Sequence, residues 1–172
     1  MFAMSKRARQ YIGIISAIVS YYVVHEGAHL IYALISGSFK KINFMGLGIQ
    51  IDVFNERMTD IQIGIFCLLG TLATLVCGYI LVGLTGKICK SRNKVFMAVT
   101  YYITLTMLIL DPVYLSILCS FFGGGDMNGI ALLVPEAAAR IVAGIVFTVN
   151  IIIFIKAVIP RYKKAFKICK RD

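Results

Sequence analysis

Four long apolar segments are separated by shorter polar segments along this chain. The apolar segments cover residues 11–35, 61–84, 95–122 and 141–159. Each is long enough to cross a bilayer as a helix, which takes about 17–25 residues. The pattern predicts an all-α polytopic membrane protein with about four transmembrane helices, folded as a single membrane-embedded domain over residues 1–172.

The polar segment between the first two apolar runs, residues 36–60, has a different pattern. Residues 49–53 alternate between apolar and polar side chains, after a glycine-containing turn at 46–48 that Ile42-Asn43-Phe44 precedes. A period of two is typical of a strand with one covered face. We therefore expect a short β-hairpin or edge strand at the membrane surface directly after the first helix. An irregular interfacial loop is the alternative interpretation.

Composition and charge support the membrane assignment. The chain is 59% hydrophobic and 15% charged, with a mean hydropathy of +0.86. Lys and Arg are concentrated in the tail at 1–10, the loop at 87–94 and the segment from Lys156 onward, which hold three, four and seven of them. The insert at 36–60 holds three, and Arg140 is alone in the last connection. By the positive-inside rule, we expect a multi-pass protein of the cell membrane with both basic tails, 1–10 and 160–172, in the cytoplasm.

The placement of basic residues at the cytoplasmic ends of the spans, next to the anionic lipid bilayer, accounts for the net charge of +10. We therefore assign no nucleic-acid partner. The first apolar run is too long for the core of a signal peptide and has no small-residue cleavage site, so we expect it to remain as an anchor. Five cysteines without a Cys-x-x-Cys pair are interpreted as small apolar core residues. They are Cys67, Cys77, Cys89, Cys119 and Cys169.

The most informative chemistry lies inside the first apolar run, where residues 25–29 read His-Glu-Gly-Ala-His. On a helix, His25 and His29 lie on one face about one turn apart, where both imidazoles can bind one zinc ion, and Glu26 beside them can act as a general base. Ionisable groups are costly at membrane depth, so they normally pair, bind a ligand or line a polar cavity. The sequence predicts one zinc ion per chain, and a hydrogen-bonded His/Glu/His network is the alternative.

A catalytic zinc ion takes three protein ligands and keeps one position open. With Glu26 reserved for proton transfer, the candidates for the third ligand are Asp111 and Asp126. Helix depth favours Asp111, because it lies roughly 24 Å along the third span and His25 lies roughly 21 Å along the first. Asp126 follows Pro112 and a run of three glycines, and a broken or re-entrant segment there can return its side chain to the site. The residues alone leave both open.

The motifs together resemble the site-2 protease family of intramembrane zinc metalloproteases. The resemblance rests on the His-Glu-Gly-Ala-His motif in the first helix, the hairpin after it, Gly70-Thr71-Leu72-Ala73-Thr74 in the second helix, and Gly125-Asp126 opening the segment at 125–132. It covers roughly residues 11–135 and is similar to the short branch of the family that lacks a PDZ domain. The resemblance implies metal ligation by His25, His29 and Asp126, with Glu26 as the catalytic base.

A zinc metalloendopeptidase that cleaves in or near transmembrane segments of other membrane proteins is therefore the expected activity. Zinc lowers the pKa of bound water to about 7, and Glu26 would take the proton as the water attacks a peptide carbonyl. Because a helical substrate hides its backbone, the strand of the insert could hold an unwound substrate segment extended. Two other interpretations are a membrane metal transporter with the histidines as a transit site, and a noncatalytic homologue that retains zinc and binds substrate helices.

Overall fold

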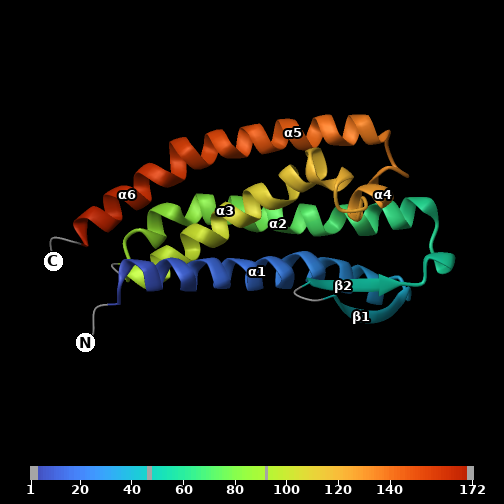
Figure 1. Cartoon of the computed structure of the whole chain (residues 1–172), viewed down its shortest axis with the longest axis horizontal. Helices are drawn as coiled ribbons and strands as arrows, with labels where there is room; N and C mark the ends of the chain where they lie inside the picture. The colour runs from blue at the N-terminus through green and yellow to red at the C-terminus, as the bar shows by residue number, and fades with distance from the viewer. Residues whose placement is uncertain (1–3, 46–47, 92, 170–172) are drawn as a thin grey trace.

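The computed structural model describes residues 4–45, 48–91 and 93–169, and most of these residues are helical (Figure 1). In chain order the elements are α1 (Lys6–Ile35), β1 (Phe39–Met45), β2 (Gly48–Val53), η1 (Asn55–Arg57), α2 (Asp60–Ile88), α3 (Lys94–Ser116), η2 (Leu118–Ser120), α4 (Asp126–Ile130), α5 (Glu136–Ile153), the π-helical η3 (Phe154–Val158) and α6 (Ile159–Ile168). Four helical segments of the described chain are long and apolar enough to cross a membrane, namely α1, α2, α3 and the continuous run from α5 to α6. The predicted fold class is confirmed.

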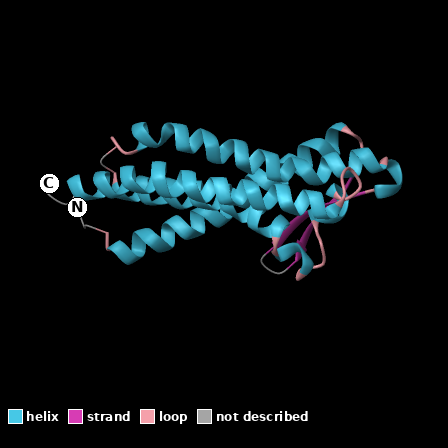
Figure 2. Ribbon diagram, turned by 90° about the horizontal axis from the view of Figure 1, so that it is seen from above, coloured by secondary structure: helices cyan, strands magenta, loops and turns pink. Residues whose placement is uncertain are grey.

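The hairpin predicted after the first helix is also present. β1 and β2 pair in antiparallel register, with Ile42 opposite Ile51 and a register shift between Phe39 and Lys41. Gly46 and Leu47 of the predicted turn lie outside the described residues. Figure 2 shows the hairpin against the bundle at the end opposite both termini.

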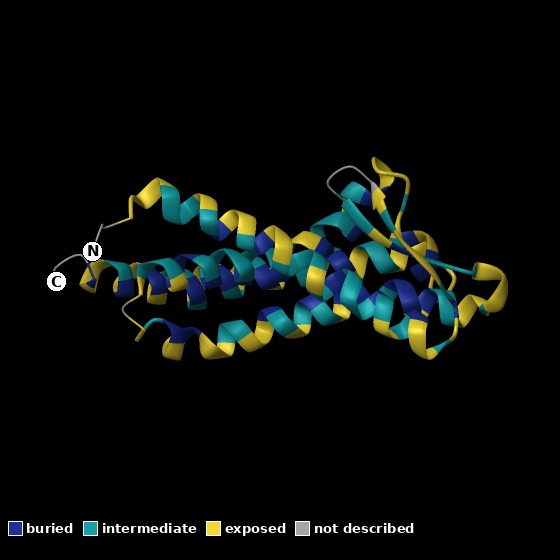
Figure 3. Ribbon diagram, turned by 90° about the horizontal axis from the view of Figure 1, so that it is seen from below, coloured by how far each residue is buried: buried dark blue, intermediate teal, exposed yellow. Residues whose placement is uncertain are grey.

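Helix α1 presents apolar side chains outward and small or polar side chains inward. The buried residues of α1 are Gly13, Ala17, His25, His29 and Ala33, and they are spaced by four or eight residues along the helix. The exposed residues of the described chain are yellow in Figure 3. The exposed large apolar residues of α1 are Tyr11, Ile14, Ile15, Ile18, Val19, Val23, Ile31, Leu34 and Ile35. This distribution suits a bundle surrounded by lipid, where small residues let helices approach closely.

The third span differs from its prediction. It was expected to run to residue 122, but α3 ends at Ser116, and the chain then turns through η2 and three glycines with positive φ before α4. Pro112 lies inside α3 and does not end it. A proline removes one backbone donor and leaves the carbonyl four residues earlier without its helical partner. Here that carbonyl belongs to Leu108, and it accepts a hydrogen bond of 2.6 Å from Asn150 Nδ2 on α5.

The basic segments predicted as tails are largely helical in the described residues. Lys6, Arg7 and Arg9 lie in the first turns of α1, and the carboxyl-terminal segment forms α6 as far as Ile168. Residues 1–3 and 170–172 of these tails lie outside the described residues.

Candidate metal centre

Two imidazoles of α1 form the base of the candidate site. His25 and His29 are 7% and 3% exposed, and their Nε2 atoms lie 3.2 Å apart. The i, i+4 spacing within an unbroken helix is sufficient to place them on one face. The two imidazoles therefore lie together on one face of α1, as the sequence predicts.

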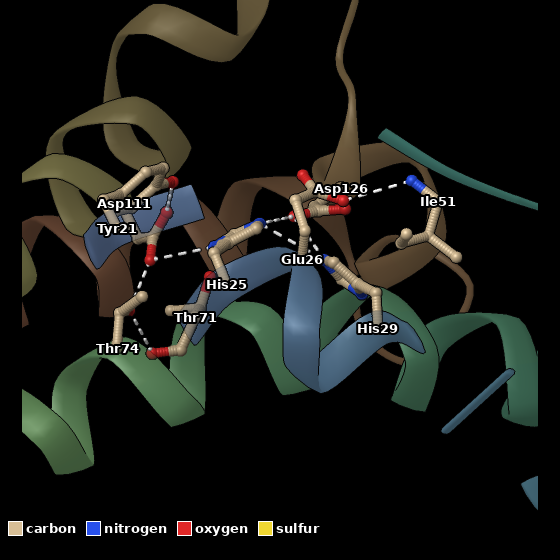
Figure 4. A network of polar contacts seen from close by, with 9 residues as sticks. All are labelled: Tyr21, His25, Glu26, His29, Ile51, Thr71, Thr74, Asp111 and Asp126. Atoms are coloured by element: carbon tan, nitrogen blue, oxygen red, sulfur yellow. Dashed lines mark hydrogen bonds and ion pairs between the residues drawn. The ribbon is translucent and has the colours of Figure 1, made fainter. Parts of the chain in front are cut away.

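Asp126 reaches the same point from the other side of the bundle. It is the first residue of α4, directly after Gly123, Gly124 and Gly125, whose φ angles are +79°, +87° and +46°. Such angles are strained for residues with a Cβ, so the glycine run permits the tight reversal that follows α3. The reversal returns the chain toward α1, and Asp126 Oδ2 lies 3.1 Å from His25 Nε2 and 3.5 Å from His29 Nε2 (Figure 4).

The three potential ligand atoms fit the spacing that zinc requires. The edge of a regular tetrahedron is about 1.63 times its centre-to-vertex distance, so zinc bonds of about 2.0–2.1 Å place neighbouring ligand atoms about 3.3–3.4 Å apart. The observed separations are 3.1, 3.2 and 3.5 Å. His25, His29 and Asp126 form the one group of three or more His, Cys, Asp or Glu residues, within the described chain, that could hold a metal ion.

Asp111 lies behind His25 instead of beside both histidines. Its Oδ2 is 3.3 Å from His25 Nδ1, on the side of the ring that faces away from His29. Tyr21 and Thr74 also donate hydroxyl hydrogen bonds to the Asp111 carboxylate. A carboxylate only accepts, so His25 Nδ1 carries a hydrogen and Nε2 is the ring nitrogen left to bind a metal ion. This carboxylate-histidine pair is the arrangement that orients metal-binding imidazoles in proteins.

The chemistry of the cluster also fits a cation. Two buried ring nitrogens and a carboxylate oxygen converge, and these are ligand types that zinc binds in proteins. Burial raises the pKa of Asp126, but contacts with His25 and His29 outweigh that effect and lower the pKa to about 2. The carboxyl group is therefore ionised at neutral pH, as a metal ligand must be.

Glu26 lies next to the cluster and contacts the hairpin. Its Oε2 accepts a 3.1 Å hydrogen bond from the backbone N–H of Ile51 on β2. β2 is paired with β1 on one edge and with no other strand in the described residues, so this N–H belongs to the unpaired edge. Figure 4 shows Glu26 between the imidazoles and the strand. The hairpin thus positions the residue predicted to be the base.

The α2 helix packs against the imidazoles at Gly70, which has no side chain. A Cβ added at Gly70 would lie 2.5 Å from His29 Nε2 and 2.7 Å from His25 Nε2, so only glycine fits there. One turn further along α2, Thr74 holds Asp111. Thr71 between them has a buried hydroxyl without a hydrogen-bond partner in the part of the chain that the structure describes.

Sequence reasoning missed the contributions of Tyr21, Ile51 and the Thr74 hydroxyl. Tyr21 had one available signal, since it precedes His25 by four residues and so shares its helix face. Ile51 acts through its backbone, which no side-chain pattern records. The contact of Thr74 with Asp111 joins two helices that are far apart in sequence.

Comparison with models of protein families, with curated proteins and with solved structures found no match to this chain. A family assignment therefore depends on the motifs and on the geometry of the site.

Proposed function

We propose that this protein is an intramembrane zinc metalloendopeptidase that cleaves peptide bonds in or near transmembrane segments of other membrane proteins. The observation that carries the proposal is the convergence of His25 Nε2, His29 Nε2 and Asp126 Oδ2 at separations of 3.1–3.5 Å, with Glu26 adjoining them. The four predicted transmembrane helices place this cluster in a bundle that is long and apolar enough to cross a bilayer. The resemblance of residues 11–135 to site-2 proteases gives the same activity.

In this proposal the three side chains hold the zinc ion, and Asp111 keeps the His25 ring in the required tautomer and orientation. Zinc, when bound, supplies Lewis acidity that makes water more acidic and polarises a peptide carbonyl. Glu26 accepts the proton from the attacking water and returns it to the leaving amine nitrogen.

The hairpin supplies a way to present the substrate. A helical substrate has its backbone amides in internal hydrogen bonds, so cleavage requires an extended segment. The free edge of β2 offers main-chain groups next to Glu26, and an unwound substrate strand could pair with it. That strand would compete with Glu26 for the Ile51 N–H, so docking would free the carboxylate near the scissile bond.

The test compares Glu26→Gln with the wild-type protein in vesicles that contain a single-span reporter helix tagged at both ends. Gln keeps the shape of the side chain but cannot accept the proton, so we expect cleavage to fall by about a hundredfold or more. Glu56→Gln, at an exposed glutamate in η1, is the matched control and should cleave at the wild-type rate. Zinc content is measured on all three proteins.

The outcomes separate the possible functions. Zinc retained by Glu26→Gln together with lost cleavage supports the protease. Cleavage by Glu26→Gln at the wild-type rate would overturn the assignment of the base. Zinc binding without any cleavage by the wild-type protein indicates a noncatalytic homologue, and zinc flux across the vesicles indicates a transporter.

A further inference from the structure

A cavity is lined by residues of α1, α3 and α6. The parts of these helices that line it lie at the end of the bundle opposite the hairpin (Figure 1). The cavity has a volume of about 430 Å³ and is formed by the start of α1, the start of α3 and the length of α6. Ligand sites in proteins commonly have volumes of about 300–1,000 Å³, so this cavity is large enough for a small polar group and part of an attached chain.

The polar part of the cavity is strongly basic. Lys6 and Arg9 of α1, Lys94 of α3 and Lys163 of α6 line it, together with the amide side chain of Gln10. Among the described residues, no Asp or Glu lines the cavity, and no ion pair involves any of the four cations. Four like charges from three helices repel one another unless an anion lies between them.

The remaining wall of the cavity is aromatic. Tyr101, Tyr102, Tyr162 and Phe166 line it, and Tyr101 packs edge-on against both Tyr102 and Tyr162. Tyr162 is 2% exposed and donates a 3.0 Å hydrogen bond to Thr100 Oγ1, so this wall is held firmly in the core. A ligand with an anionic head and an apolar body would match both parts of the lining.

The depth of the cavity in the membrane narrows the choice of ligand. Lys6 and Lys94 are the first residues of two membrane-spanning helices, and Lys163 lies in the last ten residues of the fourth span. Residues at the ends of spans lie at the level of the lipid headgroups. Basic pockets between transmembrane helices at this level suit the phosphate of anionic lipids.

We propose that this cavity binds the headgroup of an anionic phospholipid, with Lys6, Arg9, Lys94 and Lys163 around the phosphate and the acyl chains along the tyrosine wall. Charge complementarity and the position at the end of the spans favour a lipid over an acidic protein segment. The inference does not depend on the proposed protease activity, because no residue of the metal centre contributes to the cavity.

The experiment titrates the purified full-length chain in neutral detergent with phosphatidylglycerol, and separately with phosphatidylcholine, and counts bound lipids by native mass spectrometry. The variant Lys94→Gln/Lys163→Gln removes two charges from the cavity. Lys164→Gln/Lys167→Gln removes two exposed lysine charges from α6 that do not line the cavity, and it is the matched control. A third arm titrates inorganic phosphate and follows thermal stability.

We expect one phosphatidylglycerol to bind the wild-type chain at least tenfold more tightly than phosphatidylcholine, because the four cations that line the cavity attract the net negative charge of phosphatidylglycerol. The cavity variant should weaken that binding by about thirtyfold, and the control by less than about threefold. Equal binding of both lipids, or equal weakening in both variants, would overturn the proposal. Inorganic phosphate that binds as tightly as the lipid would assign the site to a soluble anion instead.

Should Lys94→Gln/Lys163→Gln fail to fold, Arg9→Gln provides the same test with one charge. Its side chain lines the cavity and otherwise donates a hydrogen bond of 2.5 Å to the Met4 carbonyl at the exposed start of α1. A loss of about fivefold in phosphatidylglycerol affinity is expected, and unchanged affinity would count against the site.

Discussion

Gly70 is the residue at which a single methyl group should destroy the metal centre without removing any ligand. In Gly70→Ala, the new Cβ would lie 2.5 Å from His29 Nε2 and 2.7 Å from both Cε1 and Nε2 of His25. All three atoms belong to rings that are buried between α1 and α2. The rings cannot rotate away without leaving the position at which they face Asp126.

The displacement can be compared with what a zinc site tolerates. An ordinary van der Waals contact of a Cβ begins at 3.4 Å, so relief of the 2.5 Å contact requires about 0.9 Å of movement. Metal-ligand distances are tolerated within about 0.2 Å, and disturbance of the groups around a metal site typically lowers affinity by about 10–100-fold. We expect zinc affinity to fall at least to that extent.

The assay measures zinc per chain in purified protein at a buffered free zinc concentration, with far-UV circular dichroism as the check on helix content. Gly83→Ala is the control on the same helix, because a Cβ at Gly83 meets no atom within 4 Å. It should bind zinc as the wild-type protein does and be slightly more stable, since alanine is the better helix former. Wild-type zinc affinity in folded Gly70→Ala would refute the close packing of α2 on the imidazoles.

Three further comparisons test the metal centre and the contacts around it. Asp111→Asn should reduce zinc affinity by about 10–100-fold, because Asp111 acts on the metal through His25. Asp126→Asn removes a proposed ligand and should reduce zinc affinity further. If a zinc titration gives the reverse order, the roles of the two aspartates are exchanged. Asn150→Leu should lower the free energy of unfolding in detergent by about 1 kcal/mol, because a carbonyl of α3 loses its donor, and an unchanged value would show that water replaces it. Ile51→Pro removes the backbone N–H and should slow cleavage by roughly 10–100-fold at unchanged zinc content. Ile51→Val keeps the N–H and should cleave at the wild-type rate. Equal cleavage rates for the two variants would refute a role for the edge of β2.

The spans, the hairpin and the pairing of the two imidazoles were predictable because each depends on local periodicity. The i, i+4 relation of His25 and His29 holds in any α-helix, and the alternation at 49–53 holds in any strand. The end of α3 was not predictable in the same way. Pro112 looked like a break, yet the helix continues through it, and Asn150, which is 42 residues away from Leu108, donates to the carbonyl that proline leaves free.

The choice between Asp111 and Asp126 as the third ligand also depends on contacts that local periodicity does not determine. By distance along a helix, Asp111 was the nearer partner for the histidines, and only the reversal through three glycines with positive φ returns Asp126 to them. Residue types and spacing in the amino-acid sequence by themselves determined that this is a helical membrane protein with two imidazoles on one helix face. Helix depth favoured Asp111 and the family resemblance implied Asp126, and the tertiary structure decided which carboxylate lies beside both rings and which lies behind one of them. Contacts between separate helices depend on how the chain packs and not on any local period.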